Sequence, residues 1–283
     1  MISVVLPTYN GEKYISQAIE SILNQTFKDF ELVIINDAST DHTLRIVNGY
    51  AEKDERIKVI TNTVNSKLPK SLNIGFRICK GDYFTWTSDD NILHPDVFKK
   101  LVSALENHSD VSFVFSCEEF IDEKGKVIGR RKHPHNLNEI YFKNIISASF
   151  LYRRDVHEQL GGYDETKFLV EDYDFFLRAY EKYKFLYIPE VLYSYRKHAE
   201  SLTGTRRMEA KSRTIELLKL FNQRASSEEV RSMTAKGISN LYLDLSNEYF
   251  FQVLDEGIKS DVSYLKLHRI KDAMIRFFQK KAK

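Results

Sequence analysis

The first hundred residues alternate short apolar runs with segments of helical periodicity. Apolar runs over residues 2–6, 32–35, 57–60 and 83–86 predict buried strands. Apolar positions at helical spacing predict helices over residues 13–24, after the capping candidates Thr40 and Asp41, over residues 71–78, and from Pro95 through residue 105. Strands that alternate with helices are typical of βαβ units, which build a mostly parallel sheet.

The middle of the chain mixes strand and helix patterns. We predict a strand over residues 111–118, a hairpin over 120–128 that turns at 122–125, and a strand over 150–153. A helix should follow and end at Gly161-Gly162, and residues 172–180 should form another. Two further strands are expected over residues 185–188 and 193–196.

Beyond about residue 205 the strand signals fade, and apolar positions recur at helical spacing near residues 215–221, 241–254 and 267–278. We therefore expect an α/β domain over residues 1–205 and a helical C-terminal extension over residues 206–283.

Composition narrows the class of protein. The 283 residues are 42% hydrophobic and 29% charged with a net charge of +2, which argues against disorder and against a dedicated nucleic-acid binder. Cys79 and Cys117 have no metal or redox spacing, and we expect buried thiols of a reducing compartment. With neither a signal-peptide pattern nor an apolar run of roughly 18 residues, a cytoplasmic location is expected.

Three polar clusters stand directly after predicted strands. They are Pro7-Thr8-Tyr9-Asn10, Asn36-Asp37-Ala38-Ser39 and Ser88-Asp89-Asp90. Ligands of open α/β sheets bind beyond the carboxyl ends of the strands, so the position of these clusters indicates a binding site. An isolated acidic pair is more often solvated or caps a helix. At a strand end, however, the hard oxygens of such a pair suit Mg²⁺ or Mn²⁺ bridged to phosphate.

The other candidate residues each have two interpretations. Asp37 either forms an Asx-turn or accepts hydrogen bonds from a ribose or a base. Glu171-Asp172 either favours a helix N-terminus or supplies a general base for an acceptor hydroxyl. His198 is either an ordinary surface or core histidine or part of a metal or diphosphate site with its basic neighbours and Ser201.

The ordered set of these motifs resembles glycosyltransferase family 2, the inverting transferases with the GT-A fold. The resemblance covers roughly residues 1–205 and rests on residues 4–10, 32–41, 72–75, 81–83, 88–90, 161–164, 171–174 and 196–201. It implies a Rossmann-like, mostly parallel mixed sheet flanked by helices, with a nucleotide-binding half over residues 1–100 and an acceptor-binding half over 101–205.

The resemblance also implies roles for individual residues. The nucleotide-sugar donor would be held by Pro7, Thr8, Tyr9, Asp37, Asn73, Ser88 and Asp89. Mn²⁺ or Mg²⁺ would be bound by Asp90 and His198, and the diphosphate by Arg196 and Ser201. Asp172 would be the catalytic base, with Glu171, Gly162 and Tyr163 supporting it or contacting the acceptor.

Two positions depart from the family pattern. Ser88 stands where the D-x-D motif of the family begins with aspartate, which leaves Asp89 and Asp90 as the acids. Leu72 stands where many relatives carry an arginine, and Lys67 or Lys70 is placed to supply the missing contact.

The implied function is metal-dependent, inverting transfer of a sugar from a nucleotide diphosphate, most often UDP, to a hydroxyl of a glycan or lipid-linked acceptor in cell-surface polysaccharide synthesis. Two alternatives stay open. One is a catalytically silent relative that acts as a binding or assembly subunit. The other is a sugar nucleotidyltransferase, although residues 8–11 do not resemble the glycine-rich basic loop of that class.

The basic C-terminal segment, residues 264–283, has two interpretations. Its apolar face either packs on the protein or docks on anionic lipid, giving a peripheral membrane contact. Self-association as a homo-oligomer through the helical tail is also open, and nothing in the sequence indicates a nucleic-acid partner.

Overall fold

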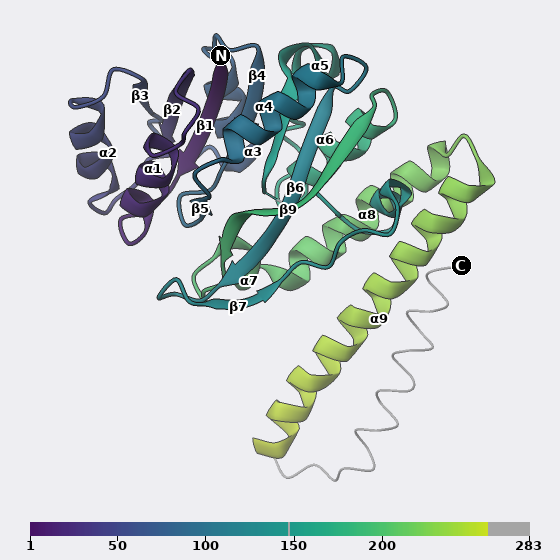
Figure 1. The fold of residues 1–283 in the computed structure, drawn as a ribbon. Coiled ribbons are helices and arrows are strands. Elements are labelled where there is room, and N and C mark those ends of the chain that lie inside the picture. Colours follow the sequence, from purple (N-terminus) through teal and green to yellow (C-terminus); the bar gives the residue numbers. More distant parts are fainter. Residues whose placement is uncertain (147, 260–283) are drawn as a thin grey trace. The chain divides into compact units, whose positions relative to one another are not determined.

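The chain folds into alternating strands and helices over its first hundred residues, as predicted (Figure 1). The computed structural model describes residues 1–146 and 148–259. The elements of the first part are β1 (Ile2–Thr8), α1 (Ile15–Leu23), β2 (Phe30–Asn36), α2 (Thr43–Ala51), β3 (Ile57–Thr61), α3 (Leu68–Phe76), β4 (Tyr83–Trp86), β5 (Ile92–Leu93) and α4 (Val97–Asn107).

The middle of the chain completes the sheet. Its elements are β6 (Phe113–Ile121), β7 (Val127–Arg130), the 3₁₀ helix η1 (Leu137–Tyr141), β8 (Phe150–Arg153), α5 (Arg154–Leu160), α6 (Glu171–Tyr180), β9 (Phe185–Arg196) and the short helix α7 (Leu202–Thr205). The helices α8 (Arg207–Arg224) and α9 (Glu228–Lys259) follow.

The described strands form one mixed sheet in the order β3-β2-β1-β4-β8-β6-β9-β5, with β7 added to β6. Strands β3, β2, β1 and β4 are parallel, and β6 and β9 form a further parallel pair. The strand β8 lies antiparallel between β4 and β6, so β6 and β9 again run in the direction of β1. The carboxyl ends of β1, β2, β4, β6 and β9 therefore lie at the same edge of the sheet.

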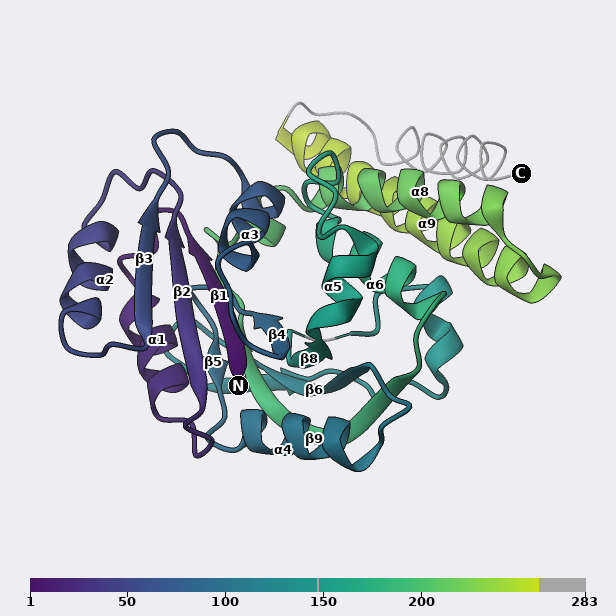
Figure 2. The ribbon, with the colours of Figure 1, turned by 90° about the horizontal axis from the view of Figure 1, so that it is seen from above.

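Helices cover both faces of the sheet, which curves when seen from above (Figure 2). One face packs alternate residues of β1, such as Val4 and Leu6, against apolar positions of α1 and α4. The other face packs α3, α5 and α6 over an aromatic layer that includes Phe84, Phe113 and Tyr152. The expected α/β architecture is confirmed, and this core holds the loops at the carboxyl edge.

The structure corrects several expected boundaries. The strands expected over residues 185–188 and 193–196 are one continuous strand, β9, whose pairing with β6 shifts in register between Ser116 and Glu118. The strand β1 continues through Pro7 to Thr8, and α4 begins at Val97, two residues after Pro95. The two-residue strand β5 was not predicted, because a pattern this short has no recognisable periodicity.

The described chain divides into two compact units. The first unit comprises Met1–Leu137 and Ile145–Gly204, and the second comprises Asn138–Asn144 and the chain from Thr205 onward. In the second unit, α8 packs against α9. The buried apolar residues of α8 are Ile215, Leu217, Leu218 and Phe221. Residues 264–283, for which a membrane contact was considered, lie outside the described residues.

No helix among the described residues combines the length and the hydropathy needed to cross a bilayer. Cys79 and Cys117 are both buried free thiols, as expected.

Candidate active site

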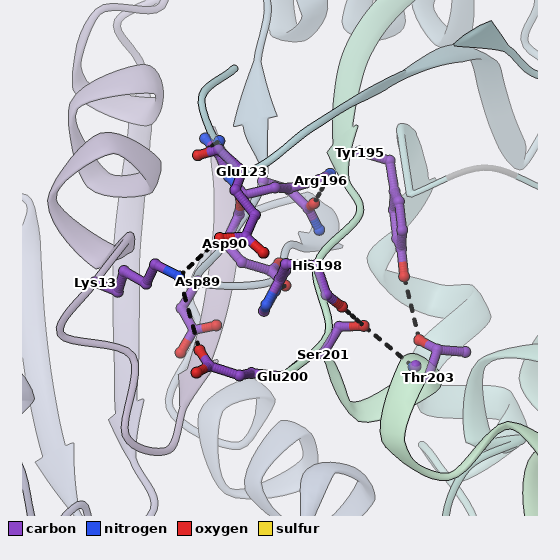
Figure 3. Close-up of polar contacts among 12 residues, drawn as sticks. Lys13, Asp89, Asp90, Glu123, Tyr195, Arg196, His198, Glu200, Ser201 and Thr203 are labelled. Carbon is purple, nitrogen blue, oxygen red and sulfur yellow. Dashed lines mark hydrogen bonds and ion pairs between the residues drawn. The ribbon is translucent and has the colours of Figure 1, made fainter. Parts of the chain in front are cut away.

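The predicted polar clusters meet at the carboxyl edge of the sheet. Thr8 ends β1, Asp37 follows β2, and Asp89 and Asp90 follow β4. His198 follows β9, and Figure 3 shows it beside Asp90. Residues more than a hundred positions apart in the sequence become neighbours because their strands run in the same direction.

Asp89 is held by the end of β1. Thr8 Oγ1 donates a hydrogen bond to Asp89 Oδ2 at 2.5 Å. Gly11 lies so close that an added Cβ would stand 2.2 Å from this same carboxylate oxygen. Burial, and then the charge of Asp90, raise the pKa of Asp89 to about 7. The two adjacent carboxylates therefore repel each other, as expected of a pair that a cation would stabilise.

Asp90 and His198 form a partly buried pair with unused lone pairs. Asp90 Oδ2 lies 3.0 Å from His198 Nε2, and the two side chains are 19% and 8% exposed. Asp90 Oδ1 and His198 Nδ1 are both buried and have no hydrogen-bond partner within the described part of the chain. Buried polar atoms are normally paired, so this arrangement leaves one oxygen atom and one nitrogen atom open to a ligand.

Arg196 organises the backbone around this pair. Its side chain is buried, and its Nε donates to the carbonyl oxygen of Asp90 at 2.8 Å. Its Nη1 donates to the carbonyl oxygens of Asp122 and Glu123 at 3.1 Å each, and its Nη2 donates to Gln17 Oε1 at 2.8 Å. These donors bind protein acceptors, so the geometry gives Arg196 a positioning role, and a contact with diphosphate stays a prediction.

The turn after His198 is closed by Ser201. Ser201 Oγ donates to the carbonyl oxygen of His198 at 3.0 Å and accepts the N–H of Gly204 at 3.1 Å. Lys13 lies 3.2 Å from Glu123 and 3.9 Å from Glu200, so it links the start of α1 to both neighbouring loops. Figure 3 shows these side chains around Asp90 and His198.

Asp37 fixes the loop before α3. Its side chain is buried, and it accepts hydrogen bonds from Asn62 Nδ2 at 2.7 Å and from the backbone N–H groups of Ser66 at 2.8 Å and Lys67 at 2.9 Å. Ala38 has a positive φ of 60° beside it. Asp37 thus holds the loop in place, while its predicted contact with a nucleotide is untested by this geometry.

The remaining donor-side candidates differ in exposure. Pro7 is buried within β1, Ser88 is half-buried, and the ring of Tyr9 is 50% exposed at the end of the strand. An exposed aromatic face beside a polar cluster is available to stack on a planar ligand.

Asn73 clamps the loop that carries Gly162 and Tyr163. Its Nδ2 donates to the carbonyl oxygen of Tyr163 at 2.8 Å and to Glu165 Oε1 at 3.1 Å, and its Oδ1 accepts the N–H of Tyr163 at 3.0 Å. Gly162 has a φ of 76°, and a Cβ there would lie 2.8 Å from Asn73 Oδ1. Asn73, predicted on the donor side, therefore connects α3 to the predicted acceptor loop.

Glu171 and Asp172 begin α6, one residue earlier than predicted. Glu171 is buried, its Oε2 has no partner in the described chain, and burial followed by the charge of Asp172 raises its pKa to about 8. Asp172 is half-buried, and its Oδ1 accepts the N–H of Tyr173 at 2.7 Å.

Tyr195 lies within range of the charges of both Asp90 and Asp172. Burial raises the pKa of Tyr195, and the charges of Asp90, Glu118 and Asp172 add to this effect. The predicted base and the predicted metal ligand thus act on the same tyrosine of β9.

Asp90 and His198 fit a divalent ion whose coordination is completed by a bound ligand. Within the described residues, no group of three or more His, Cys, Asp and Glu side chains is arranged to hold a metal ion. Mg²⁺ and similar ions are commonly held by one or two protein groups together with substrate phosphates and water. Asp90 Oδ1 is buried and unpartnered, which matches a carboxylate ligand of a metal that a bound phosphate completes, and His198 faces the same carboxylate with Nε2.

Three supporting residues were not predicted from the sequence. Asn91 accepts the backbone N–H of Arg196 at 2.7 Å, Gln17 accepts its guanidinium, and the ring of Tyr14 lies 4.5 Å from the guanidinium carbon and 5.2 Å from the ring of His198. Tyr14 immediately precedes α1 and Gln17 lies in its first turn, so both stand at the start of this helix. Their neighbours on β9 could not be identified without the fold.

Comparisons with known proteins agree on one family. Residues 3–162 match the sequence family described as glycosyl transferase family 2. An uncharacterized glycosyltransferase of Methanocaldococcus jannaschii is 35% identical over 205 residues, covering 69% of this chain and 70% of its own length. The Bacillus subtilis protein EpsE, named as a glycosyltransferase, is 33% identical over 207 residues, covering 71% of this chain and 74% of its own.

Solved structures show a similar fold. TarS 1-349 of S. aureus, in complex with UDP-GlcNAc, has a TM-score of 0.67 at 21% identity, over 98% of this chain and 80% of its own. A mannosyltransferase of Pyrobaculum calidifontis, in complex with GDP-Man and Mn²⁺, has a TM-score of 0.67 at 16% identity, over 99% of this chain and 82% of its own. These similarities confirm the predicted fold class.

Proposed function

Since the chain belongs to glycosyl transferase family 2 and is a glycosyltransferase, we propose that it transfers a sugar from a nucleotide diphosphate to an acceptor hydroxyl, with a divalent metal and with inversion. The observation that carries this proposal is the pair Asp90–His198, whose unused buried atoms stand beside Thr8–Asp89 at the carboxyl edge of the sheet. The donor and metal named for the two solved structures support it.

The proposed donor is a UDP-sugar, with the nucleotide between Tyr9 and Asp37 and the sugar near Asp89. Mn²⁺ or Mg²⁺, held by Asp90 and His198, would supply positive charge that stabilises the departing diphosphate. Arg196 keeps the Asp90 loop in position, because its guanidinium donates to the Asp90 carbonyl oxygen.

Asp172 is the proposed general base. The acceptor hydroxyl gives its proton to the Asp172 carboxylate while its oxygen forms a bond to the anomeric carbon. The bond from that carbon to the diphosphate oxygen breaks on the opposite side, so the nucleoside diphosphate leaves and the anomeric configuration inverts. Buried Glu171 lies next to the base. Gly162 and Tyr163, on the loop held by Asn73, are the proposed acceptor-side residues, and the Tyr163 ring is itself buried.

The proposed acceptor is a hydroxyl of a glycan or of a lipid-linked sugar, at the cytoplasmic face of a membrane, in synthesis of cell-surface polysaccharide. A peripheral membrane contact through residues 264–283 and self-association of the protein remain predictions.

Asp172→Asn tests the proposed base. With Mn²⁺, a panel of nucleotide sugars and candidate acceptors, we expect turnover to fall by about 10²–10⁴-fold, because proton removal is lost. Donor affinity, measured by calorimetry, should be unchanged. Asp155→Asn is the matched control, since Asp155 Oδ1 accepts the N–H of Val156 at 2.9 Å, as Asp172 does for Tyr173, but Asp155 is exposed on α5.

Full turnover by Asp172→Asn would contradict the assignment. The same assay separates the alternatives. A silent binding subunit would release no nucleotide from any donor, and a nucleotidyltransferase would instead form pyrophosphate from a nucleoside triphosphate and a sugar phosphate.

A further inference from the structure

The hairpin of β6 and β7 carries two exposed apolar side chains on an outer strand. Val127 is 47% exposed and Ile128 is 54% exposed. The pairing of β7 with β6 skips Ile128, so a β-bulge interrupts the strand beside Val127 and leaves Ile128 outside the regular register. In the described chain β7 pairs with β6 alone, which makes it an edge strand. An exposed edge of this kind is a surface for contact with something else.

Exposed basic side chains flank the apolar pair of the hairpin. Lys124, Lys126, Arg130 and Lys132 are all exposed, and they surround Val127 and Ile128 within nine residues of sequence. In the described chain only Arg130 of these four comes near a carboxylate, at 3.9 Å from Glu119.

The four acids of the hairpin contact other groups, and on β6 Glu118 pairs with Arg131 at 2.6 Å while Glu119 accepts a hydrogen bond from Ser194 Oγ at 3.0 Å. Asp122 Oδ1 accepts the backbone N–H groups of Lys124 and Lys126 at 2.9 Å each, and Glu123 is paired with Lys13. Among the described residues the ammonium groups of Lys124, Lys126 and Lys132 form no ion pair, and these exposed groups are available to an external partner.

We propose that this hairpin docks on an anionic phospholipid surface. Val127 and Ile128 enter the interfacial layer, and the surrounding lysines and arginine lie against lipid phosphates. The exposed basic side chains on both sides of the apolar pair match the negative charge of phospholipid head groups, and the apolar pair matches the layer beneath them. A second copy that paired along β7 would bring two cationic strands together, which is unfavourable.

Docking through the hairpin would place the active site at the membrane. Arg196 Nη1 binds the carbonyl oxygens of Asp122 and Glu123 in the hairpin turn, and its Nε binds the carbonyl oxygen of Asp90. The turn and the Asp90 loop are thus joined by a single buried side chain. This step rests on the proposed function, and of its two acceptor classes it selects the lipid-linked sugar.

A fluorescent label at position 128 tests the insertion. Cys79 and Cys117 are buried at 4% and 2% exposure, so a cysteine introduced by Ile128→Cys in the full chain can be labelled selectively with an environment-sensitive dye. We expect a blue shift and higher intensity with vesicles containing phosphatidylglycerol, and no change with phosphatidylcholine alone. Ser109→Cys is the control, because exposed Ser109 precedes β6 at the opposite edge of the sheet.

Charge reversal tests the electrostatic part. Lys124→Glu combined with Lys126→Glu should weaken sedimentation with phosphatidylglycerol vesicles by about tenfold or more, since each basic residue near an anionic surface contributes on the order of a fivefold preference. Lys53→Glu with Lys80→Glu is the matched control, with the same change in charge at exposed sites near the amino ends of β3 and β4.

Equal vesicle binding by both double variants, or an unchanged dye at position 128 in sedimented protein, would overturn the proposal. A dye response to protein concentration without vesicles would instead indicate self-association and would also overturn it. Donor turnover in solution should be unchanged in the hairpin variants, so a failure of docking is distinguishable from a failure of the proposed function.

Discussion

At the scale of single residues, the site depends on side chains that hold backbone as well as on those placed to bind a ligand. Arg196 is 1% exposed and binds three carbonyl oxygens and one side-chain amide. Burial of a charged group is unfavourable unless its hydrogen-bonding groups are paired, so the loss of any one of these bonds would destabilise the buried guanidinium.

Arg196→Lys should therefore reduce the free energy of unfolding by about 3 kcal/mol, because several buried acceptors lose their donors. Urea denaturation measures this, with Arg130→Lys, an exposed arginine, as control. Should stability stay unchanged while donor affinity falls, Arg196 would be a diphosphate ligand and the positioning role would be wrong.

Glu171 predicts a pH dependence of stability. Burial first, then the charge of Asp172, raise its pKa from 4.5 to about 8 in the folded chain. Between about pH 4.5 and 8 the folded state therefore holds more protons than the unfolded state, so this residue makes stability fall as the pH rises.

Glu171→Gln should flatten that dependence and stabilise the protein at pH 9 by at least about 1.4 kcal/mol, the value of one pKa unit. Thermal denaturation between pH 5 and pH 9 provides the measurement, with exposed Glu106→Gln as control. Parallel pH curves for Glu171→Gln and the wild type would rule out the raised pKa.

At the scale of elements, the end of α5 offers a matched pair of glycines. Gly161 and Gly162 have φ values of 72° and 76°, but only Gly162 would bring a Cβ against Asn73. A Cβ at Gly161 would meet open space.

Gly161→Ala should cost about 1 kcal/mol for the left-handed backbone alone. Gly162→Ala should reduce the free energy of unfolding by more than this and should also lower turnover. The added Cβ would push Asn73 Oδ1 away, and Asn73 would then lose its hydrogen bond from Tyr163. Chemical denaturation and the transfer assay check this. Equal losses of stability in the two variants would show that the hydrogen bonds of Asn73 to the Tyr163 loop do not contribute to stability.

Periodicity predicted the elements whose pattern is long or well bounded. The strand β4 and the helix α5 before Gly161 were predicted correctly, since an apolar run and a glycine pair mark their limits. The continuity of β9 could not be predicted, because Pro189 and Glu190 interrupt its apolar pattern. The strand continues through both residues with a shift in its register with β6.

The candidate site was predictable as a set of strand ends, but its internal contacts were not. The neighbourhood of Thr8, Asp90 and His198 follows from strand direction once the sheet order is known. That Asp37 and Asn73 each bind protein loops could not be predicted, since the loops approach them only through the packing of α3.

At the scale of the whole molecule, ligand binding should stabilise the unit that contains β1 to β9. UDP with Mn²⁺ should raise its melting temperature more than either alone, corresponding to about 2.7 kcal/mol at a hundredfold excess over the Kd. Asp90→Ala should remove the Mn²⁺-dependent part, whereas Asp110→Ala, an exposed acid paired with Lys184, should retain it. The same shift in the presence of chelator would exclude Asp90 as a metal ligand.

The sequence distance between Asp90 and β9 has a consequence for synthesis of the chain. Arg196 and His198 lie 106 and 108 positions after Asp90, and β5 pairs with β9 alone. Contacts of such separation are expected to form late, while chains leave the ribosome N-terminus first. A nascent chain that has released β1 to β4 lacks the residues that hold Asp90. The proposed metal site is therefore expected to form only when the sheet is complete, so chains that stop before β9 should not bind Mn²⁺ at Asp90.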